Sequence, residues 1–210
     1  MSISAVFGLP GSGKSVFLTK CVLDALNHKP TIVGGNVLQY GDYSQILTNF
    51  QVEGCKVLEW DKLGKTEIRD TLIVCDEIMI YADSRKFKTF TDDLTFFFSQ
   101  HRKFGITFLW ASQTYRDCDL RIRNLTEKFY FCEPAPIFSN KFSVISPIVS
   151  GMTVRNGEIA ESYTLASPSQ RKILYLPKYW NKFDSYQIIT KKPLQQYNFK
   201  DWETFSGVSR

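Results

Sequence analysis

The first 135 positions alternate between short apolar runs and longer segments whose apolar residues recur at helical spacing. Four runs of five or six residues are largely apolar: Ile3–Phe7, Thr71–Cys75, Ile106–Ala111 and Lys128–Cys132. Runs without polar alternation are typical of strands that are buried on both faces of a parallel sheet. We therefore expect these four segments to form the centre of one sheet.

Three segments between these runs have the spacing of helices. Val16–Asn27 carries apolar residues at helical spacing and ends before Pro30, and Thr91–Lys103 has an aromatic face and ends before Gly105. Asp119–Leu125 predicts a short third helix. This alternation of strands and helices predicts an α/β fold of three layers, in which helices cover both faces of a mostly parallel sheet.

Shorter strands are predicted at Thr31–Val33 and Val57–Trp60. The pattern then changes after Pro134-Ala-Pro136. Phe142–Tyr163 alternates apolar and polar residues around Arg155-Asn156-Gly157, which is a favourable hairpin turn.

These patterns divide the chain into two parts. We predict an α/β core over residues 1–135 and a small β-rich annex over residues 136–210 that packs on the core.

The composition is that of a folded, mildly basic protein. The 210 residues are 43% hydrophobic and 15% aromatic, with a net charge of +5. Such a charge suits an acidic partner such as nucleic acid or an anionic membrane surface, although many ordinary enzymes share it. From Ala166 onward eight Lys or Arg residues face three acidic ones, a surplus of 8 − 3 = 5 positive charges. If DNA is a partner, we expect this basic C-terminal region to contact it.

The cysteines and the N-terminus indicate the compartment. The five cysteines have no C-x-x-C spacing and no histidine pair at metal spacing, so we expect reduced thiols in a cytosolic protein. Ile3–Phe7 is too short for a signal peptide, and no apolar run is long enough to span a bilayer. Any membrane anchor is expected beyond Arg210.

The segment Gly8-Leu-Pro-Gly-Ser-Gly-Lys-Ser15 matches the P-loop pattern G-x-x-x-x-G-K-[ST]. It follows a predicted strand and precedes a predicted helix, as the motif requires. Backbone N–H groups of such a loop bind phosphate oxygens, Lys14 reaches the β- and γ-phosphates, and the Ser15 hydroxyl binds Mg²⁺. We expect the phosphates of ATP to contact Gly8, Pro10, Gly11, Ser12, Gly13, Lys14, Ser15 and Val16.

A second pair of candidate residues ends a buried strand. Asp76 and Glu77 directly follow Leu72–Cys75, and an open α/β sheet binds its ligand at the carboxyl ends of its strands. We expect Asp76 to hold Mg²⁺ and Glu77 to activate the attacking water as a general base.

Three further residues follow the next strand. Gln113 closes it, where an amide can sense the γ-phosphate, and otherwise caps the strand end. Arg121 and Arg123 follow on the short helix, and either is a candidate arginine finger, acting within its own subunit or on a neighbouring one. A solvated helix face is the alternative interpretation of each arginine taken alone.

Two other classes of enzyme share parts of this pattern. Asp61-Lys-Leu-Gly64 matches the D-x-x-G of GTPases and Asn181-Lys-Phe-Asp184 matches their N-K-x-D, but the latter does not end a buried strand. Thymidine kinases also carry an Asp-Glu pair after a strand, together with a zinc ribbon of paired cysteines that this sequence lacks.

The order of the motifs resembles the zonula occludens toxin (Zot)-like family, which includes assembly ATPases of filamentous phages. The resemblance rests on G-L-P-G-S-G-K-S, I-V-C-D-E, H-R-K-F-G-I-T-F-L-W-A-S-Q, L-R-I-R-N-L and K-F-Y-F-C, with Trp180–Tyr186 similar to the family's ending. The same order also resembles viral genome-packaging ATPases of the FtsK/HerA type. The membrane span and outer domain of the filamentous-phage members are not found in this sequence.

The resemblance implies a Mg²⁺-ATP-hydrolysing motor for virion morphogenesis. Its finger chemistry is then completed in an oligomer, such as a ring, and its partners are phage assembly or capsid proteins. Three functions stay open: phage assembly or export, translocation of DNA into a capsid, and phosphorylation of a small molecule. In the second, Tyr175, Tyr179 and Trp180 are expected to contact the DNA.

Overall fold

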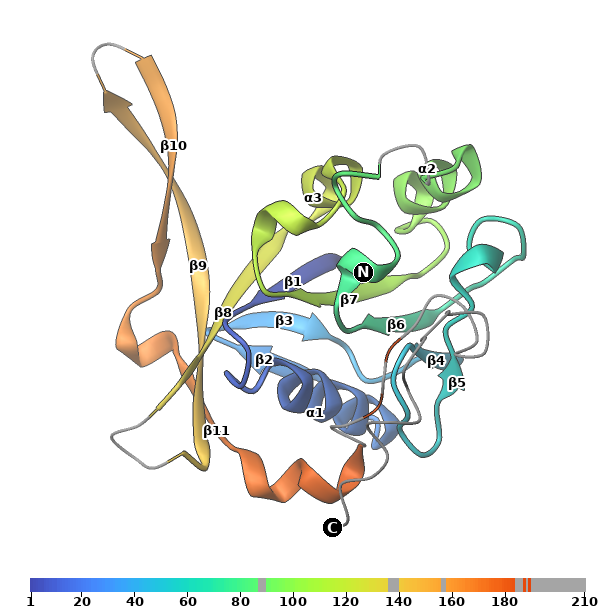
Figure 1. The fold of residues 1–210 in the computed structure, drawn as a ribbon, viewed down its shortest axis with the longest axis horizontal. Coiled ribbons are helices and arrows are strands. Elements are labelled where there is room, and N and C mark those ends of the chain that lie inside the picture. Colours follow the sequence, from blue (N-terminus) through green and yellow to red (C-terminus); the bar gives the residue numbers. More distant parts are fainter. Residues whose placement is uncertain (87–89, 136–139, 156–157, 184–186, 188, 190–210) are drawn as a thin grey trace, which may run out of the picture.

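The computed structural model describes residues 1–86, 90–135, 140–155, 158–183, 187 and 189. The described chain builds one large sheet, a separate two-stranded hairpin and three α-helices (Figure 1). The strands and helices are β1 (Ile3–Phe7), α1 (Lys14–Leu26), β2 (Thr31–Val33), β3 (Asn36–Gln39), β4 (Gln45–Thr48), β5 (Lys56–Val57), β6 (Thr71–Cys75), α2 (Asp92–Gln100), β7 (Thr107–Ser112), α3 (Leu120–Leu125), β8 (Lys128–Pro134), β9 (Phe142–Arg155), β10 (Glu158–Leu165) and β11 (Lys172–Tyr175).

The central sheet is parallel over six of its nine strands. Its order is β10-β9-β8-β1-β7-β6-β4-β5, with β11 paired to β9. The strands from β8 to β5 run parallel, whereas β9 is antiparallel to β8, and β10 and β11 are antiparallel to β9. The predicted mostly parallel sheet is therefore confirmed. Because β7 lies between β1 and β6, the strand before Gln113 separates the P-loop strand from the strand before Asp76.

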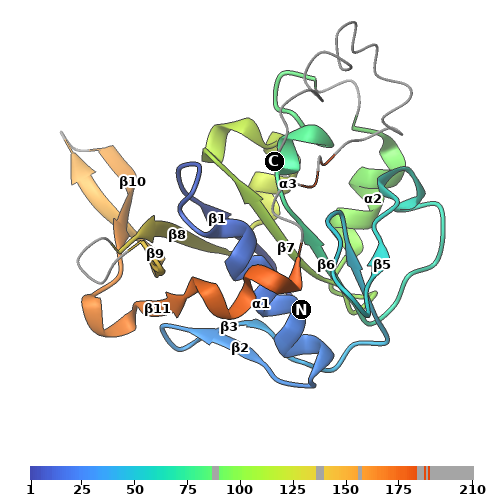
Figure 2. The ribbon, with the colours of Figure 1, turned by 60° about the horizontal axis from the view of Figure 1, so that its bottom comes forward.

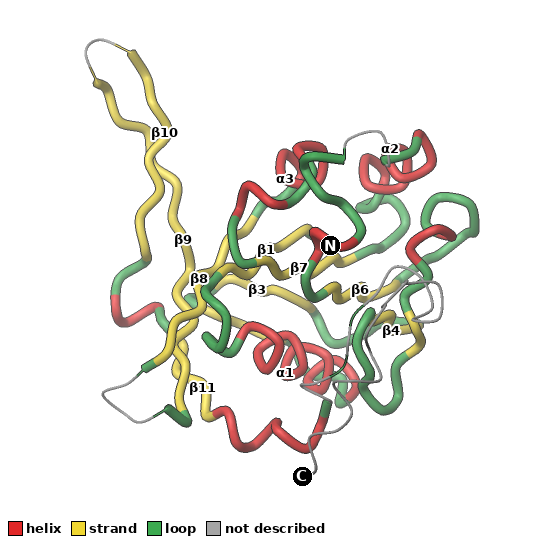
Figure 3. The backbone as a smooth tube through the Cα atoms, viewed as in Figure 1, coloured by secondary structure: helices red, strands yellow, loops and turns green. Residues whose placement is uncertain are grey.

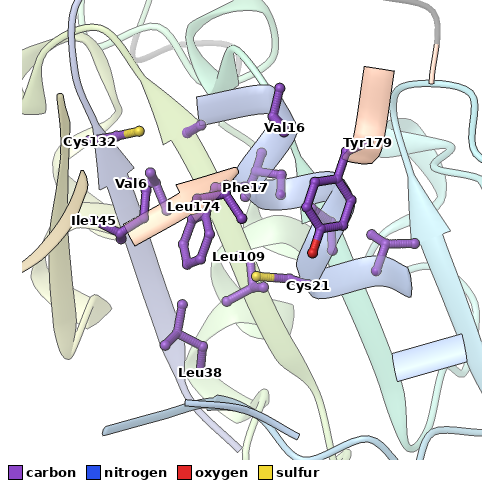
Figure 4. Packing of buried hydrophobic residues seen from close by; sticks show 14 of the residues in the cluster. Val6, Val16, Phe17, Cys21, Leu38, Leu109, Cys132, Ile145, Leu174 and Tyr179 are labelled. Carbon is purple, nitrogen blue, oxygen red and sulfur yellow. The ribbon is translucent and has the colours of Figure 1, made fainter. Parts of the chain in front are cut away.

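Helices cover both faces of this sheet, which gives the three layers. On one face of the sheet, buried side chains pack against α1, for example Val6 and Leu109 against Phe17 (Figure 4). Those of the other face, such as Phe108, pack against α2 and α3. Alternate residues of each buried strand therefore serve two different cores, which explains why these strands lack polar alternation.

The helices begin and end close to their predicted bounds, and capping side chains set the first residues of α2 and α3. Thr91 and Asp119 are N-caps rather than helical residues, because their side chains accept hydrogen bonds from the N–H groups of Leu94 and Arg121. The α2 helix ends at Gln100, three residues before the predicted end.

The region between α1 and β6 departs most from the sequence prediction. The predicted strand Val57–Trp60 is wrong in its second half: β5 ends at Val57, and Trp60 begins a 3₁₀ turn that packs under α2. Thr31–Val33 is a strand, but it pairs with β3 in the separate hairpin. That hairpin lies beside α1 on one side of the sheet (Figure 2).

The C-terminal third extends the same sheet. The predicted hairpin is present as β9 and β10, which project beyond the other strands (Figure 3). Arg155 pairs with Glu158, while the predicted turn residues Asn156 and Gly157 lie outside the described residues. After β11, a 3₁₀ segment over Leu176–Lys182 runs along α1 (Figure 2). The strands β9, β10 and β11 continue the sheet of the core. This does not test the predicted domain boundary at residue 135, which stays a prediction.

No helix within the described ranges has the length and apolar character needed to cross a bilayer.

Candidate functional site: a P-loop with an acidic strand end

The P-loop lies between β1 and α1, as predicted, and its glycines adopt conformations that suit a tight phosphate-binding turn. Gly13 is the N-cap of α1 with φ 94° and ψ 14°, which a residue with a Cβ rarely adopts. Gly8 lies so close to β8 that a Cβ there would stand 2.2 Å from the carbonyl oxygen of Cys132. Glycine at position 8 therefore allows the loop to pack against the neighbouring strand.

Lys14 places its positive charge inside this loop. Its Nζ donates to the carbonyl oxygens of Gly8 at 2.9 Å and Leu9 at 3.1 Å, and the residue is 6% exposed. The ammonium therefore lies within the P-loop, held by two of the loop's carbonyl oxygens.

Ser15 faces Asp76 across the sheet. The Ser15 hydroxyl donates to Asp76 Oδ2 at 2.5 Å, although the two residues are 61 positions apart. Asp76 directly follows β6 and is 5% exposed. The fold thus brings together the two residues that the sequence predicted as Mg²⁺ ligands.

Asn49 holds the backbone of Asp76 and was missed by the sequence analysis. Its Oδ1 accepts from the Asp76 N–H at 2.8 Å, and its Nδ2 donates to the Asp76 carbonyl at 2.7 Å. Asn49 directly follows β4, a strand that the sequence analysis did not predict. The run Ile46-Leu47-Thr48-Asn49 was the available signal, an apolar pair followed by polar residues.

Glu77 takes an uncommon backbone conformation next to Asp76. Its φ of 48° and ψ of 57° are left-handed, and its N–H donates to Asp76 Oδ1 at 3.0 Å. Non-glycine residues rarely occupy this region, and at functional sites they are often held there by their surroundings. The Gln113 side chain lies beside the Glu77 carboxylate.

Burial raises the pKa of both carboxyl groups. For Asp76, burial outweighs the opposing effects of the Ser15 hydroxyl, the Glu77 N–H and the Lys14 charge. For Glu77, burial and the neighbouring Asp76 charge raise the pKa, while Lys14 and Gln113 act in the opposite direction. A raised pKa brings a glutamate closer to the range that suits a general base.

Gln113 and Pro10 lie on the exposed rim of this site, whereas Val16 faces inward. Gln113 follows β7 and is exposed beside Glu77. Pro10 is exposed on the loop, and Val16 is 8% exposed within the core beneath α1. The structure therefore gathers Lys14 and Ser15 with Asp76, Glu77 and Gln113, while their individual roles stay predictions.

The two candidate arginines lie on α3 and contact aromatic rings. The Arg121 guanidinium lies 4.7 Å from the Phe90 ring centroid, and its Nη1 donates to the Phe90 carbonyl at 3.0 Å. The Arg123 guanidinium lies 5.0 Å from the ring centroid of Tyr115, two residues after Gln113. The structure does not join either arginine to Lys14 or Asp76, so a role toward a neighbouring subunit stays a prediction.

The P-loop is also supported from β8 and β9, which sequence analysis did not foresee. The carbonyl of Ser12 accepts hydrogen bonds from the Ser143 hydroxyl and from the Cys132 thiol, the latter at 2.9 Å. A Cβ at Gly13 would lie 2.9 Å from Ser143 Oγ and 3.1 Å from Leu176. The P-loop therefore rests on residues from the predicted annex.

The residues present suit Mg²⁺ held jointly with a nucleotide. Ser15 and Asp76 offer hard oxygen ligands side by side, and Mg²⁺ in proteins is commonly held by one or two such groups together with substrate phosphates. No cluster of three or more His, Cys, Asp or Glu suited to a metal occurs within the described part of the chain. A site completed by phosphate oxygens fits this donor set better than an all-protein cage.

The GTPase-like motif Asp61–Gly64 lies away from this site. Asp61 is exposed in the 3₁₀ turn after β5. That strand is four strands from β1 in the sheet order, a separation of about 19 Å. In the companion motif, Asp184 lies outside the described residues.

Comparison with known proteins identifies the fold. No protein-family model matches the sequence, and no curated protein matches it. Among solved structures, the N-terminal domain of zonular occludens toxin from Neisseria meningitidis is similar, with a TM-score of 0.50 and 14% identity over 87% of this chain and 98% of that chain. The genome packaging NTPase B204 from Sulfolobus turreted icosahedral virus 2, in complex with ATP-gammaS, has a TM-score of 0.47 and 12% identity over 80% of this chain and 97% of that chain.

At this identity the likeness concerns the fold. It agrees with the motif order that pointed to the Zot-like family and with the strand–loop–helix context of Gly8–Ser15. The chain therefore has the three-layer α/β fold of a P-loop nucleoside triphosphatase, which it shares with the zonular occludens toxin N-terminal domain.

Proposed function

We propose that this chain binds Mg²⁺-ATP and hydrolyses it to drive virion morphogenesis, as an assembly or export ATPase. The observation that carries the ATPase assignment is the position of Glu77. Its carboxyl group lies at the carboxyl edge of the sheet, beside Gln113 and adjacent to Asp76, which accepts from the P-loop Ser15.

Each residue has a chemical task in this proposal. Lys14 and the N–H groups of the loop bind the phosphates, and Ser15 and Asp76 hold Mg²⁺. The bound metal supplies neutralisation of the negative charge that develops on the phosphates. Glu77 accepts a proton from the attacking water, and Gln113, whose side chain lies beside the Glu77 carboxylate, orients that carboxylate.

The link to virion morphogenesis rests on the motif order and on the shared fold. The motifs resemble Zot-like assembly ATPases, and the toxin's N-terminal domain has the same architecture. In this reading the chain works in the cytoplasm of the host cell with phage assembly proteins and as an oligomer, in which Arg121 or Arg123 reaches the nucleotide of the next subunit.

Genome packaging is the alternative, since the motifs also resemble packaging ATPases and the tail is basic. The structure alters one detail of that alternative. Tyr179 is 8% exposed against α1 and cannot stack on a base, whereas Tyr175 and Trp180 are 47% and 51% exposed. Of the basic tail residues, those beyond Lys182 lie outside the described residues.

ATP hydrolysis by the purified protein, with and without single- and double-stranded DNA across a salt series, tests the proposal. An assembly ATPase is expected to hydrolyse ATP at a rate that DNA does not change. Stimulation by DNA that fades as salt rises would favour packaging, because phosphate contacts are salt-dependent. Phosphate transfer to a nucleoside, without release of inorganic phosphate, would contradict both.

A further inference from the structure

Asp76 lies just beyond the last paired residues of β4 and β6, where its backbone N–H and carbonyl need hydrogen-bond partners. Through Thr48 and Val74, β4 and β6 pair in parallel, and the Asn49 N–H still donates to the Val74 carbonyl at 3.4 Å. The chain then turns away from β6 at Phe50, whose carbonyl accepts from the Thr48 hydroxyl at 2.6 Å. A buried N–H and carbonyl at Asp76 would otherwise lose their ladder partners, which is costly.

The Asn49 side chain replaces that missing ladder. It accepts from the Asp76 N–H at 2.8 Å and donates to the Asp76 carbonyl at 2.7 Å, and the residue is 9% exposed. A carboxamide has one acceptor and one donor group at this spacing, as a peptide has, so only Asn or Gln side chains offer both. Thus the ladder extends by one residue while β4 itself departs.

Glu77, the residue that follows Asp76, has the least favourable backbone conformation of the site. Glu77 is left-handed, with φ 48°, a conformation that persists only where the surroundings hold it. The Asp76 carbonyl that accepts from Asn49 belongs to the peptide that joins Asp76 to Glu77. Fixing that peptide fixes the direction in which both side chains leave the chain, toward Ser15 and toward Gln113.

We propose that Asn49 is a positioning residue, which holds the Asp76–Glu77 peptide so that Asp76 faces Ser15 and Glu77 faces Gln113. Asn49 acts through the backbone of Asp76 and does not itself touch the nucleotide. The part of the inference that concerns turnover rests on the proposed ATPase function, whereas the part that concerns backbone geometry does not.

Gln45 provides a matched control on the same pair of strands. Its Nε2 donates to Thr71 Oγ1 at 3.3 Å, from β4 to β6, at the opposite end of β4 from Asn49. Gln45→Ala therefore removes an amide contact between the same two strands without touching Asp76.

The first test is amide hydrogen exchange of nucleotide-free protein. In Asn49→Ala the Asp76 N–H loses its acceptor, and we expect its protection to fall by about tenfold or more relative to wild type. Gln45→Ala should leave that amide protected. Unchanged protection at Asp76 in Asn49→Ala would overturn the proposal, whether or not the protein hydrolyses ATP.

The second test is kinetic. Asn49→Ala should lower kcat for ATP by about 10- to 100-fold and raise the Mg²⁺ concentration at half-maximal rate, as loss of an outer support for a metal ligand typically does. ATP binding without Mg²⁺ should stay as in wild type, because the P-loop is intact. Wild-type kcat and Mg²⁺ dependence in Asn49→Ala would overturn the positioning role. Absence of hydrolysis by wild type would instead refute the proposed function and leave the exchange test standing.

Asn49→Asp serves if the alanine variant does not fold. It keeps the shape and the acceptor but loses the donor, so the Asp76 N–H should stay protected while kcat still falls at least several-fold. Wild-type turnover in this variant would show that the bond to the Asp76 carbonyl has no role in positioning.

Discussion

At the scale of single residues, substitution of the P-loop lysine tests the phosphate site. Lys14 is buried inside the loop with its ammonium on two carbonyl oxygens. Lys14→Ala should reduce ATP hydrolysis to below about 1% of wild type, because a positive charge at the phosphates is lost. Lys29→Ala, an exposed lysine beyond α1, is the control and should keep wild-type activity. If Lys14→Ala hydrolyses ATP at the original rate, the phosphate site is assigned wrongly.

The Glu77 carboxyl group is expected to make the free energy of unfolding depend on pH. Its pKa is raised in the folded protein, chiefly by burial and by Asp76, so the folded state binds a proton more readily than the unfolded state. The charged carboxylate therefore destabilises the fold at high pH, and this effect disappears as pH falls below the ordinary value of 4.5. Glu77→Gln without nucleotide should be more stable than wild type at pH 7.5 and equal at pH 4.

Urea denaturation at the two pH values measures that difference. A Glu77→Gln midpoint below that of wild type at pH 7.5, or a difference that does not change with pH, would show that the carboxylate is not destabilised in the fold.

Residue types at the site were predictable where they follow a motif. The P-loop and the Asp76–Glu77 pair stand in fixed relation to strand ends, so the sequence alone predicted that Ser15 and Asp76 would meet. Asn49 and Ser143 were not predictable in this way. Each acts through a hydrogen bond to a distant backbone group, Asp76 or Ser12. A local pattern can at most indicate the short strand before Asn49, and it does not show which backbone group the side chain contacts.

At the scale of elements, the contact between the P-loop and β8 explains a glycine. A Cβ at Gly8 would lie 2.2 Å from the Cys132 carbonyl oxygen, which is backbone and cannot move aside cheaply. Gly8→Ala should lower the free energy of unfolding by about 1–3 kcal/mol and weaken nucleotide binding, because the loop must shift away from β8.

Gly35→Ala provides the comparison for this prediction. Gly35 also has a positive φ, 79°, but a Cβ there meets nothing within 4 Å, so only the conformational cost of about 1 kcal/mol applies. Chemical denaturation of both variants, with a fluorescent ATP analogue to measure binding, decides the matter. If Gly8→Ala is as stable as wild type and binds the ATP analogue as tightly, the packing argument is wrong.

Buried strands and helices were predictable at this scale because their apolar periods are long. The misplaced elements lie between α1 and β6, where β4 and β5 have only four and two residues. So few residues carry no clear period, and the pairing of β4 with β6 and of β5 with β4 decides their structure. Trp60 looked like a strand residue, but its ring stacks on Tyr81 at 5.2 Å in the layer beneath α2.

At the scale of the whole molecule, the open question is whether one subunit completes the site of the next. Arg123 stacks on Tyr115 near the rim that carries Gln113. If it acts on a neighbouring nucleotide, Arg123→Ala should lower kcat by about 10³-fold, while Arg69→Ala, an exposed arginine paired with Glu67, should not.

Mixing variants distinguishes action between subunits from action within one. Arg123→Ala keeps its P-loop and Lys14→Ala keeps its arginine, so random mixing at equal amounts should restore about a quarter of wild-type activity. The same mixture with Arg121→Ala tests the other candidate. Complete inactivity of both mixtures, with each single variant folded, would place the arginine chemistry within one chain or exclude it.

Whether Glu77 is the general base is tested by comparing ATP binding and ATP hydrolysis by wild type and Glu77→Gln in the presence of Mg²⁺. Because Glu77 is assigned as the general base beside an intact P-loop, the variant should bind ATP as tightly as wild type and hydrolyse it about 10² to 10⁴ times more slowly. Wild-type turnover by Glu77→Gln would contradict the account, since the strand end after β6 would then not be the catalytic edge of a P-loop ATPase.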